Sequence, residues 1–192
     1  MYSQLLVKAS PSDLELLSAV CMFDDYVEYT HDLMWDNDKS PIVDNMLKNC
    51  SLNNPEIKQS AVYGVGVCAQ VAENSKFQVY LPNALEAVKS VLSQKDSKYD
   101  IARDCAVGAL GKIALYQKQD MIQEWISYLP IKAEPEEAQS VNKLFLNNLS
   151  NLSGYQGTDE VIRQLVALIN QESTKEILDE EGKQILAGIT SQ

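Results

Sequence analysis

Residues 55–72 read PEIKQSAVYGVGVCAQVA, and this stretch decides the fold that we expect for the chain. Its apolar side chains recur with spacings of 4, 4, 3 and 4 residues, at Ile57, Ala61, Val65, Cys68 and Ala72. Such spacings place side chains on one face of an α-helix. Asn54 is a good N-cap, and a proline such as Pro55 suits the first helical position. The stretch therefore predicts an amphipathic helix.

The same pattern returns 45 residues later, at Ala102, Ala106, Leu110 and Ile113. Similar stripes lie within residues 11–29 and within residues 138–149. We expect partner helices between the stripes, over residues 43–50, 76–93, 121–129, 158–170 and 177–189. Pro11 and Pro135 are expected at first helical positions as Pro55 is, and Pro82 is expected to kink or start its helix. No convincing alternating strand pattern is found.

The repeat period of about 40 to 45 residues identifies the kind of repeat. Ankyrin and tetratricopeptide units, at about 33 and 34 residues, are too short, whereas HEAT or armadillo units fit. A helical hairpin cannot bury its apolar face alone, so neighbouring hairpins must stack. We predict an all-α fold, an α-solenoid of about five HEAT-type hairpins that forms one segment over residues 1–192. In each hairpin the first helix is called A and the second B.

Four glycines lie inside predicted B helices, at Gly64, Gly66, Gly108 and Gly111. Glycine in a helix interior costs about 1 kcal/mol relative to alanine, so we expect neighbouring helices to approach closely there. A phosphate-binding loop is disfavoured, because no strand precedes the glycines and no Gly-Lys-Ser/Thr sequence follows them.

The net charge of the chain limits the classes of molecule that it can attract. The 192 residues include 16 basic and 27 acidic side chains, a formal charge of −11. This balance argues against nucleic acid and anionic membranes, and favours a basic partner. No apolar run reaches the length of a membrane span, and residues 1–10 do not resemble a secretory signal. The four cysteines are expected to be buried, reduced thiols; with His31 as the one histidine, no zinc site is expected.

Four stretches resemble the importin-beta superfamily of nuclear transport receptors, nearest to its karyopherin beta-3 (importin-5) branch. They are residues 21–28 (CMFDDYVE), 59–70 (QSAVYGVGVCAQ), 104–113 (DCAVGALGKI) and 125–131 (WISYLPI). They are similar to the family's C-F-D-D-x-V-E helix, its R-Q-A-A-x-Y-G-L-G-x-x-A-Q helix, the next B helix and its W-L-x-x-L-P-L stretch. The order and spacing match the family over Ser12 to Leu152. Gln59 and Ser60 replace the usual Arg-Gln, and residues 31–41 differ from the family pattern.

The resemblance implies that the chain is a C-terminal fragment of a longer receptor without enzymatic activity or cofactor. Such a receptor shuttles between cytoplasm and nucleus. It would carry basic cargo proteins, contact phenylalanine-glycine nucleoporins and release cargo to the GTPase Ran, which acts through the full-length receptor. The alternative is a HEAT scaffold subunit of a phosphatase or vesicle-coat complex, which would share the repeat period and the charge.

The candidate cargo-binding residues are Asp24, Asp25 and Glu28 on the first B helix. Asp24 and Glu28 are i,i+4 neighbours of like charge, an arrangement that destabilises a helix unless something compensates. One interpretation is a carboxylate patch for the lysines of a basic partner; the other is a solvated helix face. A catalytic acid–base pair is disfavoured, and so is a calcium site at residues 32–44, because the EF-hand spacing is missing.

Further expectations concern the two ends of the stack, the two tryptophans and His31. We expect residues 2–9 to form half a hairpin whose open side could self-associate, and Asp179, Glu180 and Glu181 to be a solvent-facing cap near the natural C-terminus. Trp125 is expected in the core. Trp35 packs over helix ends or helps to hold a partner, and His31 has a capping or surface role.

Overall fold

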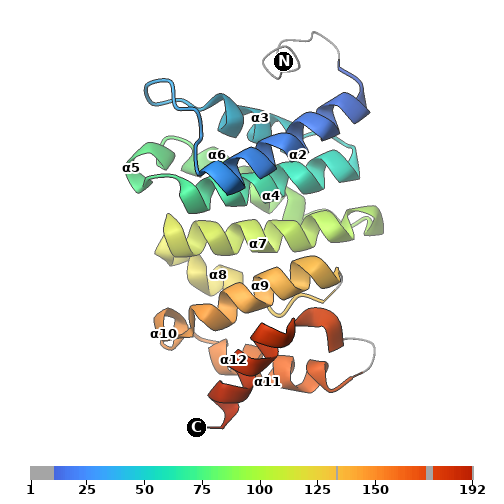
Figure 1. Ribbon diagram of the computed structural model, residues 1–192, viewed down its shortest axis with the longest axis vertical. Helices are drawn as coiled ribbons and strands as arrows, with labels where there is room; N and C mark the ends of the chain where they lie inside the picture. The colour runs from blue at the N-terminus through green and yellow to red at the C-terminus, as the bar shows by residue number, and fades with distance from the viewer. Residues whose placement is uncertain (1–10, 133, 172–174, 192) are drawn as a thin grey trace.

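The computed structural model describes residues 11–132, 134–171 and 175–191 of the chain. Five B helices stack along the long axis of the molecule (Figure 1). They are α2 (Asp13–Thr30), α4 (Pro55–Val71), α7 (Asp100–Tyr116), α9 (Pro135–Asn147) and α12 (Glu180–Thr190). The A helices form a second layer, with α3 (Pro41–Cys50), α6 (Leu81–Leu92), α8 (Ile122–Ile126) and α11 (Thr158–Ile169).

Within the described residues this arrangement makes four hairpins and one further B helix, α2. Short segments join them: α5 (Asn74–Phe77), α10 (Leu149–Leu152), and the 3₁₀ turns η1 (Ser97–Tyr99), η2 (Gln119–Met121) and η3 (Lys175–Ile177). Each described B helix packs on the next along the chain. The prediction of an all-α HEAT solenoid is confirmed. The predicted helix over residues 2–9 lies outside the described residues.

The helix starts follow local capping rules, with one departure from expectation. Pro55 and Pro135 begin α4 and α9 as predicted, and the Asn54 side chain accepts hydrogen bonds from the N–H groups of the first turn. Pro11, in contrast, does not begin α2, so that prediction was wrong. Ser12 and Glu15 form a reciprocal capping box that satisfies two backbone N–H groups, and this sets the start at Asp13.

The predicted helix over residues 76–93 is two helices, α5 and α6. Pro82, which has no N–H to donate, lies in the first turn of α6 and starts the second helix. Between the two helices, the Tyr80 hydroxyl accepts a 2.7 Å hydrogen bond from the Ser40 N–H. Trp35, from the loop before α3, packs on Tyr80 and lies beneath the Lys76 ammonium, so it covers helix ends.

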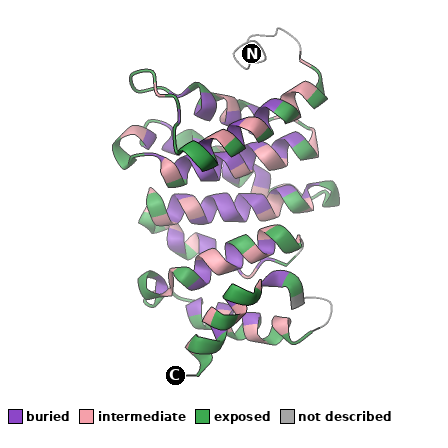
Figure 2. Ribbon diagram, in the orientation of Figure 1, coloured by how far each residue is buried: buried purple, intermediate pink, exposed green. Residues whose placement is uncertain are grey.

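The core lies between the two layers (Figure 2). Trp125 is fully buried, as predicted, and meets Phe145 edge-on at 6.3 Å between ring centroids. The glycines allow the predicted close approach. A Cβ on Gly111 would come within 2.5 Å of the Trp125 ring, and one on Gly66 within 2.7 Å of the Ala109 backbone in the next B helix.

Polar side chains connect successive repeats. The Gln117 side chain donates to the carbonyls of Ala69 and Ala72 at 2.6 and 3.1 Å, where α4 ends. The Asn142 side chain donates to the carbonyls of Ile131 and Ile177 at 3.1 and 3.2 Å. The last carbonyls of a helix lack partners within that helix. The Gln117 side chain therefore acts as a C-cap of α4 that the next repeat supplies.

Two expectations about individual side chains need correction. Cys50, Cys68 and Cys105 are buried free thiols, but Cys21 is exposed because it lies off the buried stripe of α2, with its Sγ 3.5 Å from the Ser60 hydroxyl. Asp179 is more than a solvent-facing residue. It caps α12 through the Gly182 N–H and pairs with Lys143 of α9 at 2.6 Å.

Candidate functional site on the B-helix face

The three predicted carboxyl residues do not form one exposed patch. Asp25 and Glu28 are exposed, but Asp24 is only 7% exposed and lies between α2 and α4. Both interpretations of these acids, a carboxylate patch for a basic partner and a solvated helix face, place Asp24 on the surface, so that expectation was wrong. The correction has a structural cause: α4 carries a glycine, Gly64, opposite Asp24, and the carboxyl group occupies the space that a side chain would fill.

Burial dominates the chemistry of Asp24. Loss of water, reinforced by repulsion from Asp25 and Glu28, raises the pKa of Asp24 to about 8, against the opposing attraction of Lys112. Its Oδ1 atom is buried without a hydrogen-bond partner among the described residues. Near neutral pH the group is therefore mostly protonated in the free chain, and it adds little negative charge to the surface.

Tyr63 and Lys112 join the acidic residues of α2 to the next two B helices. The Tyr63 hydroxyl, on α4, donates a 3.1 Å hydrogen bond to Glu28 Oε2. Lys112, on α7, places its ammonium 4.6 Å from the centre of the Tyr63 ring, a cation–π contact. Burial lowers the pKa of Lys112, while the carboxylates of Glu137 and Glu28 oppose that shift. Lys112 is thus a largely buried cation among carboxylates from two other B helices.

Glu137 of α9 lies on the far side of this cluster. Its Oε1 occupies the space beside Gly108, where a Cβ would come within 2.5 Å of it. Burial raises the pKa of Glu137, whereas Lys112 and a hydrogen bond with the Cys105 thiol lower it. Glycine therefore admits a carboxyl group to the helix interface at two successive repeats, Gly64 for Asp24 and Gly108 for Glu137.

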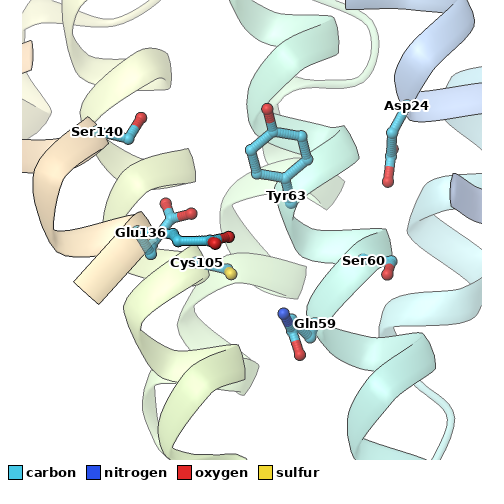
Figure 3. A pocket seen from close by; sticks show the side chains of 8 residues that line it. Asp24, Gln59, Ser60, Tyr63, Cys105, Glu136 and Ser140 are labelled. Carbon is cyan, nitrogen blue, oxygen red and sulfur yellow. The ribbon is translucent and has the colours of Figure 1, made fainter. Parts of the chain in front are cut away.

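A cavity of about 360 Å³ opens between these helices (Figure 3). It is lined by Asp24, Gln59, Ser60, Tyr63, Cys105, Glu136, Glu137 and Ser140, from α2, α4, α7 and α9. In Figure 3, Tyr63 lies between Asp24 on one side and Glu136 and Ser140 on the other. The lining holds three carboxyl groups and no basic side chain. This composition favours a cationic group. The solvent side of α2, α4, α7 and α9 that carries the cavity is called the B-helix face below.

Sequence reasoning found α2 but missed the residues that other helices contribute, namely Tyr63, Lys112, Glu136 and Glu137. The available signal was the pair Gly64 and Gly108, which we related to helix packing and not to buried acids. His31 has the capping role that was expected: in a left-handed conformation, its N–H donates to the Val27 carbonyl at the end of α2. Among the described residues, no group of three or more potential ligands is placed to hold a metal ion.

The stacked hairpins and their continuous B-helix layer define an α-solenoid of the HEAT type. No protein-family profile matches the chain. Over 95% of its length the chain is 28% identical to a protein of Dictyostelium discoideum described as a probable importin-5 homolog. The chain spans 18% of that protein's length. This similarity confirms the resemblance to the importin-beta superfamily, and it supports the identification of the chain as a segment of such a receptor.

No helix in the described part of the chain combines the length and the apolar character that crossing a bilayer requires.

Proposed function

We propose that the chain is part of a nuclear import receptor and that its B-helix face contributes to holding a basic protein partner. The observation that carries the proposal is the similarity to an importin-5 homolog over 95% of the chain. The cavity adds independent support, because its lining is acidic and lies on the helix layer that solenoids commonly use for recognition.

The charge of the chain agrees with such a partner. The formal charge of −11 creates a field that attracts basic proteins and repels nucleic acid and anionic membranes. Asp25, Glu28 and Glu136 are exposed carboxylates on the B-helix face, so they contribute to this field directly. We infer that they increase the rate of encounter, whereas contacts inside the cavity determine how long the partner stays bound.

The other functions that we propose are those of the whole receptor. By resemblance it binds phenylalanine-glycine nucleoporins, shuttles between cytoplasm and nucleus, and releases cargo when GTP-bound Ran engages it. The segment acts by binding, without catalysis and without a cofactor. We further propose that it comes from the C-terminal part of the solenoid, which is the part of the family that the four stretches resemble, and that residues 1–192 form a single solenoid segment.

Capture of the intact parent protein tests this proposal. An antibody against this chain is used on native lysate, with and without GTP-locked Ran. The expected result is a protein much larger than 21.4 kDa that releases basic proteins when Ran is added. A partner set that is indifferent to Ran would contradict the proposal and would favour a HEAT scaffold, such as a phosphatase or vesicle-coat subunit.

A further inference from the structure

We propose that the buried carboxyl group of Asp24 makes the contact between α2 and α4 a pH-sensitive joint, which is closed while the group is protonated and loosens when it ionises. The proposal concerns the first two described B helices and does not depend on which partner the chain binds. It is argued from the enclosure of the carboxyl group, from the charges around it and from the contacts that hold α2 on the stack.

The Asp24 carboxyl group is enclosed within the α2–α4 contact. Asp24 is 7% exposed, and its Oδ1 occupies the space of a side chain at Gly64, with the Met46 sulfur beside the same space. Oδ1 has no hydrogen-bond partner among the described residues. A buried carboxyl group without a partner costs far less free energy when it is neutral than when it is charged, because an ion loses its hydration. The closed contact therefore fits the protonated group.

The charges around Asp24 also oppose its ionisation. Burial and repulsion from Asp25 and Glu28 raise the pKa of Asp24 to about 8, and only Lys112 opposes this shift. The titratable groups that interact with Asp24 come from four helices: Asp25 and Glu28 on α2, Cys50 on α3, Tyr63 and Cys68 on α4, and Lys112 on α7. Lys112 is the one cation among these groups.

Lys112 is held by other groups and does not neutralise Asp24. Its ammonium lies 4.6 Å from the centre of the Tyr63 ring, and the carboxylates of Glu137 and Glu28 favour its charged form. No ion pair within the described residues joins Lys112 to Asp24. An ionised Asp24 therefore requires water, and water reaches its Oδ1 only when α2 moves away from α4.

The helix α2 can open without the rest of the stack. It lies at one end of the described residues (Figure 1) and packs mainly on α4, whereas α4 also packs on α3 and α7. Two hydrogen bonds across the joint are exposed, from Asn54 to Asp13 at 2.9 Å and from Tyr63 to Glu28 at 3.1 Å. Stability in a solenoid is a sum of repeat and nearest-neighbour contributions, so a weakened contact opens locally.

The direction of the pH effect follows from the affinity for the proton. The closed joint holds the Asp24 proton with a pKa of about 8, compared with an ordinary value of 3.8 once the group is in water. The closed state is therefore favoured at low pH and is lost as pH rises towards 8. Within this window the opening equilibrium should increase by about tenfold per pH unit, and above about pH 8 it should become constant.

Opening of the joint would alter the B-helix face. Asp25 and Glu28 are exposed residues of α2, so a loosened α2 no longer holds their carboxylates in a fixed position beside α4. The joint thus makes the geometry of one end of this face depend on pH.

Hydrogen exchange of the whole chain, followed by mass spectrometry between about pH 5.5 and pH 9, tests the joint. After correction for the intrinsic exchange rate, the protection of α2 amides should fall by about tenfold per pH unit up to pH 7.5 and level off above pH 8.5. Asp24→Asn should remove this dependence, because its amide does not titrate. Asp38→Asn, in an exposed loop, should retain it. The amides of α7 should stay better protected than those of α2 at every pH.

Equal protection of α2 and α7 would show that the chain opens as a whole and would overturn the inference. So would a pH dependence in α2 that Asp24→Asn leaves intact. If Asp24→Asn does not fold, nuclear magnetic resonance of the unmodified chain with ¹³C-labelled aspartate decides. One carboxyl carbon should titrate near pH 8 while the α2 amides lose protection over the same range. Titration of every aspartate below about pH 6 would overturn the inference.

Discussion

The carboxyl group of Asp24 lies against the backbone of Gly64 in the neighbouring B helix. A Cβ atom at position 64 would overlap Asp24 Oδ1 and would come within 2.7 Å of the Met46 sulfur. The glycine thus creates the space in which an acid is buried between two repeats. The same relationship recurs between Gly108 and Glu137 one repeat later, so the acidic cavity depends on two helix-interior glycines.

Gly64→Ala should destabilise the chain although alanine is the better helix former. The overlap costs about 1 to 3 kcal/mol, and the gain in helix propensity, about 1 kcal/mol, offsets only part of it. Urea denaturation followed by circular dichroism measures the difference. Gly188→Ala is the matched control, because nothing lies within 4 Å of a Cβ at that helix position, and it should be neutral or stabilising. Equal effects of the two substitutions would contradict the packing relationship.

Asp24→Asn should change how stability depends on pH. The pKa of Asp24 is about 8 in the folded chain and near 3.8 when the group is free, so the folded state holds the proton more tightly. Its contribution to stability is complete below pH 4 and declines as pH rises towards 8, because the unfolded chain then binds fewer protons.

Urea denaturation at several pH values should therefore show that the unfolding free energy of Asp24→Asn increases relative to that of the unmodified chain from pH 4.5 to pH 7. The variant removes up to about 4 kcal/mol of this pH-dependent loss at pH 7. Asp38→Asn, in an exposed loop, should retain the slope of the unmodified chain. Parallel pH profiles for the unmodified chain and Asp24→Asn would show that Asp24 is not the titrating group.

The fold could be predicted from the sequence because the apolar residues of each repeat recur at helical spacing and mark the face that is buried. The stripe that begins at Ile57 lies in α4, its match 45 residues later lies in α7, and Trp125 lies in the core as expected. The start of α2 was misplaced because two N-terminal signals compete there, and the Ser12–Glu15 capping box prevails over Pro11.

The candidate site was only partly predictable. Asp25 and Glu28 could be identified from one helix, but the cavity combines side chains from four B helices that are up to about 115 residues apart in sequence. Which of two adjacent acids faces the neighbouring helix depends on the rotation of α2 against α4. That rotation is a property of the packed repeats, and no local pattern specifies it.

Lys112 and Glu137 should show strong energetic coupling. Removing one partner of a buried ionic cluster leaves the other unpaired, so Lys112→Met should lower the unfolding free energy by about 3 kcal/mol. In the Lys112→Met, Glu137→Gln double variant the loss should be smaller than the sum of the single losses. Lys89→Met is the control; it breaks an exposed pair with Glu124 and should cost at most about 1 kcal/mol. Additive effects at Lys112 and Glu137 would contradict the coupling.

Asn142 should contribute to stability by joining repeats. Asn142→Ala removes two buried hydrogen bonds and leaves the Ile131 and Ile177 carbonyls without this donor. We expect a loss of about 2 to 3 kcal/mol in thermal or urea denaturation. Asn147→Ala, at the exposed end of the same helix, should be nearly neutral. A neutral Asn142→Ala would show that these contacts do not join the repeats energetically.

The central claim is that the B-helix face binds a basic partner, and two charge-matched triple variants test it most directly. One neutralises exposed acids of that face, with Asp25→Asn, Glu28→Gln and Glu136→Gln. The other neutralises exposed acids elsewhere, with Asp38→Asn, Glu86→Gln and Asp159→Asn. Both raise the net charge equally, so long-range attraction changes equally. Titration with a labelled Gly-Ser peptide that carries a short run of arginines, followed by fluorescence anisotropy, should give a loss of affinity of about tenfold or more for the first variant and about twofold for the second. Equal losses for the two variants would contradict the claim.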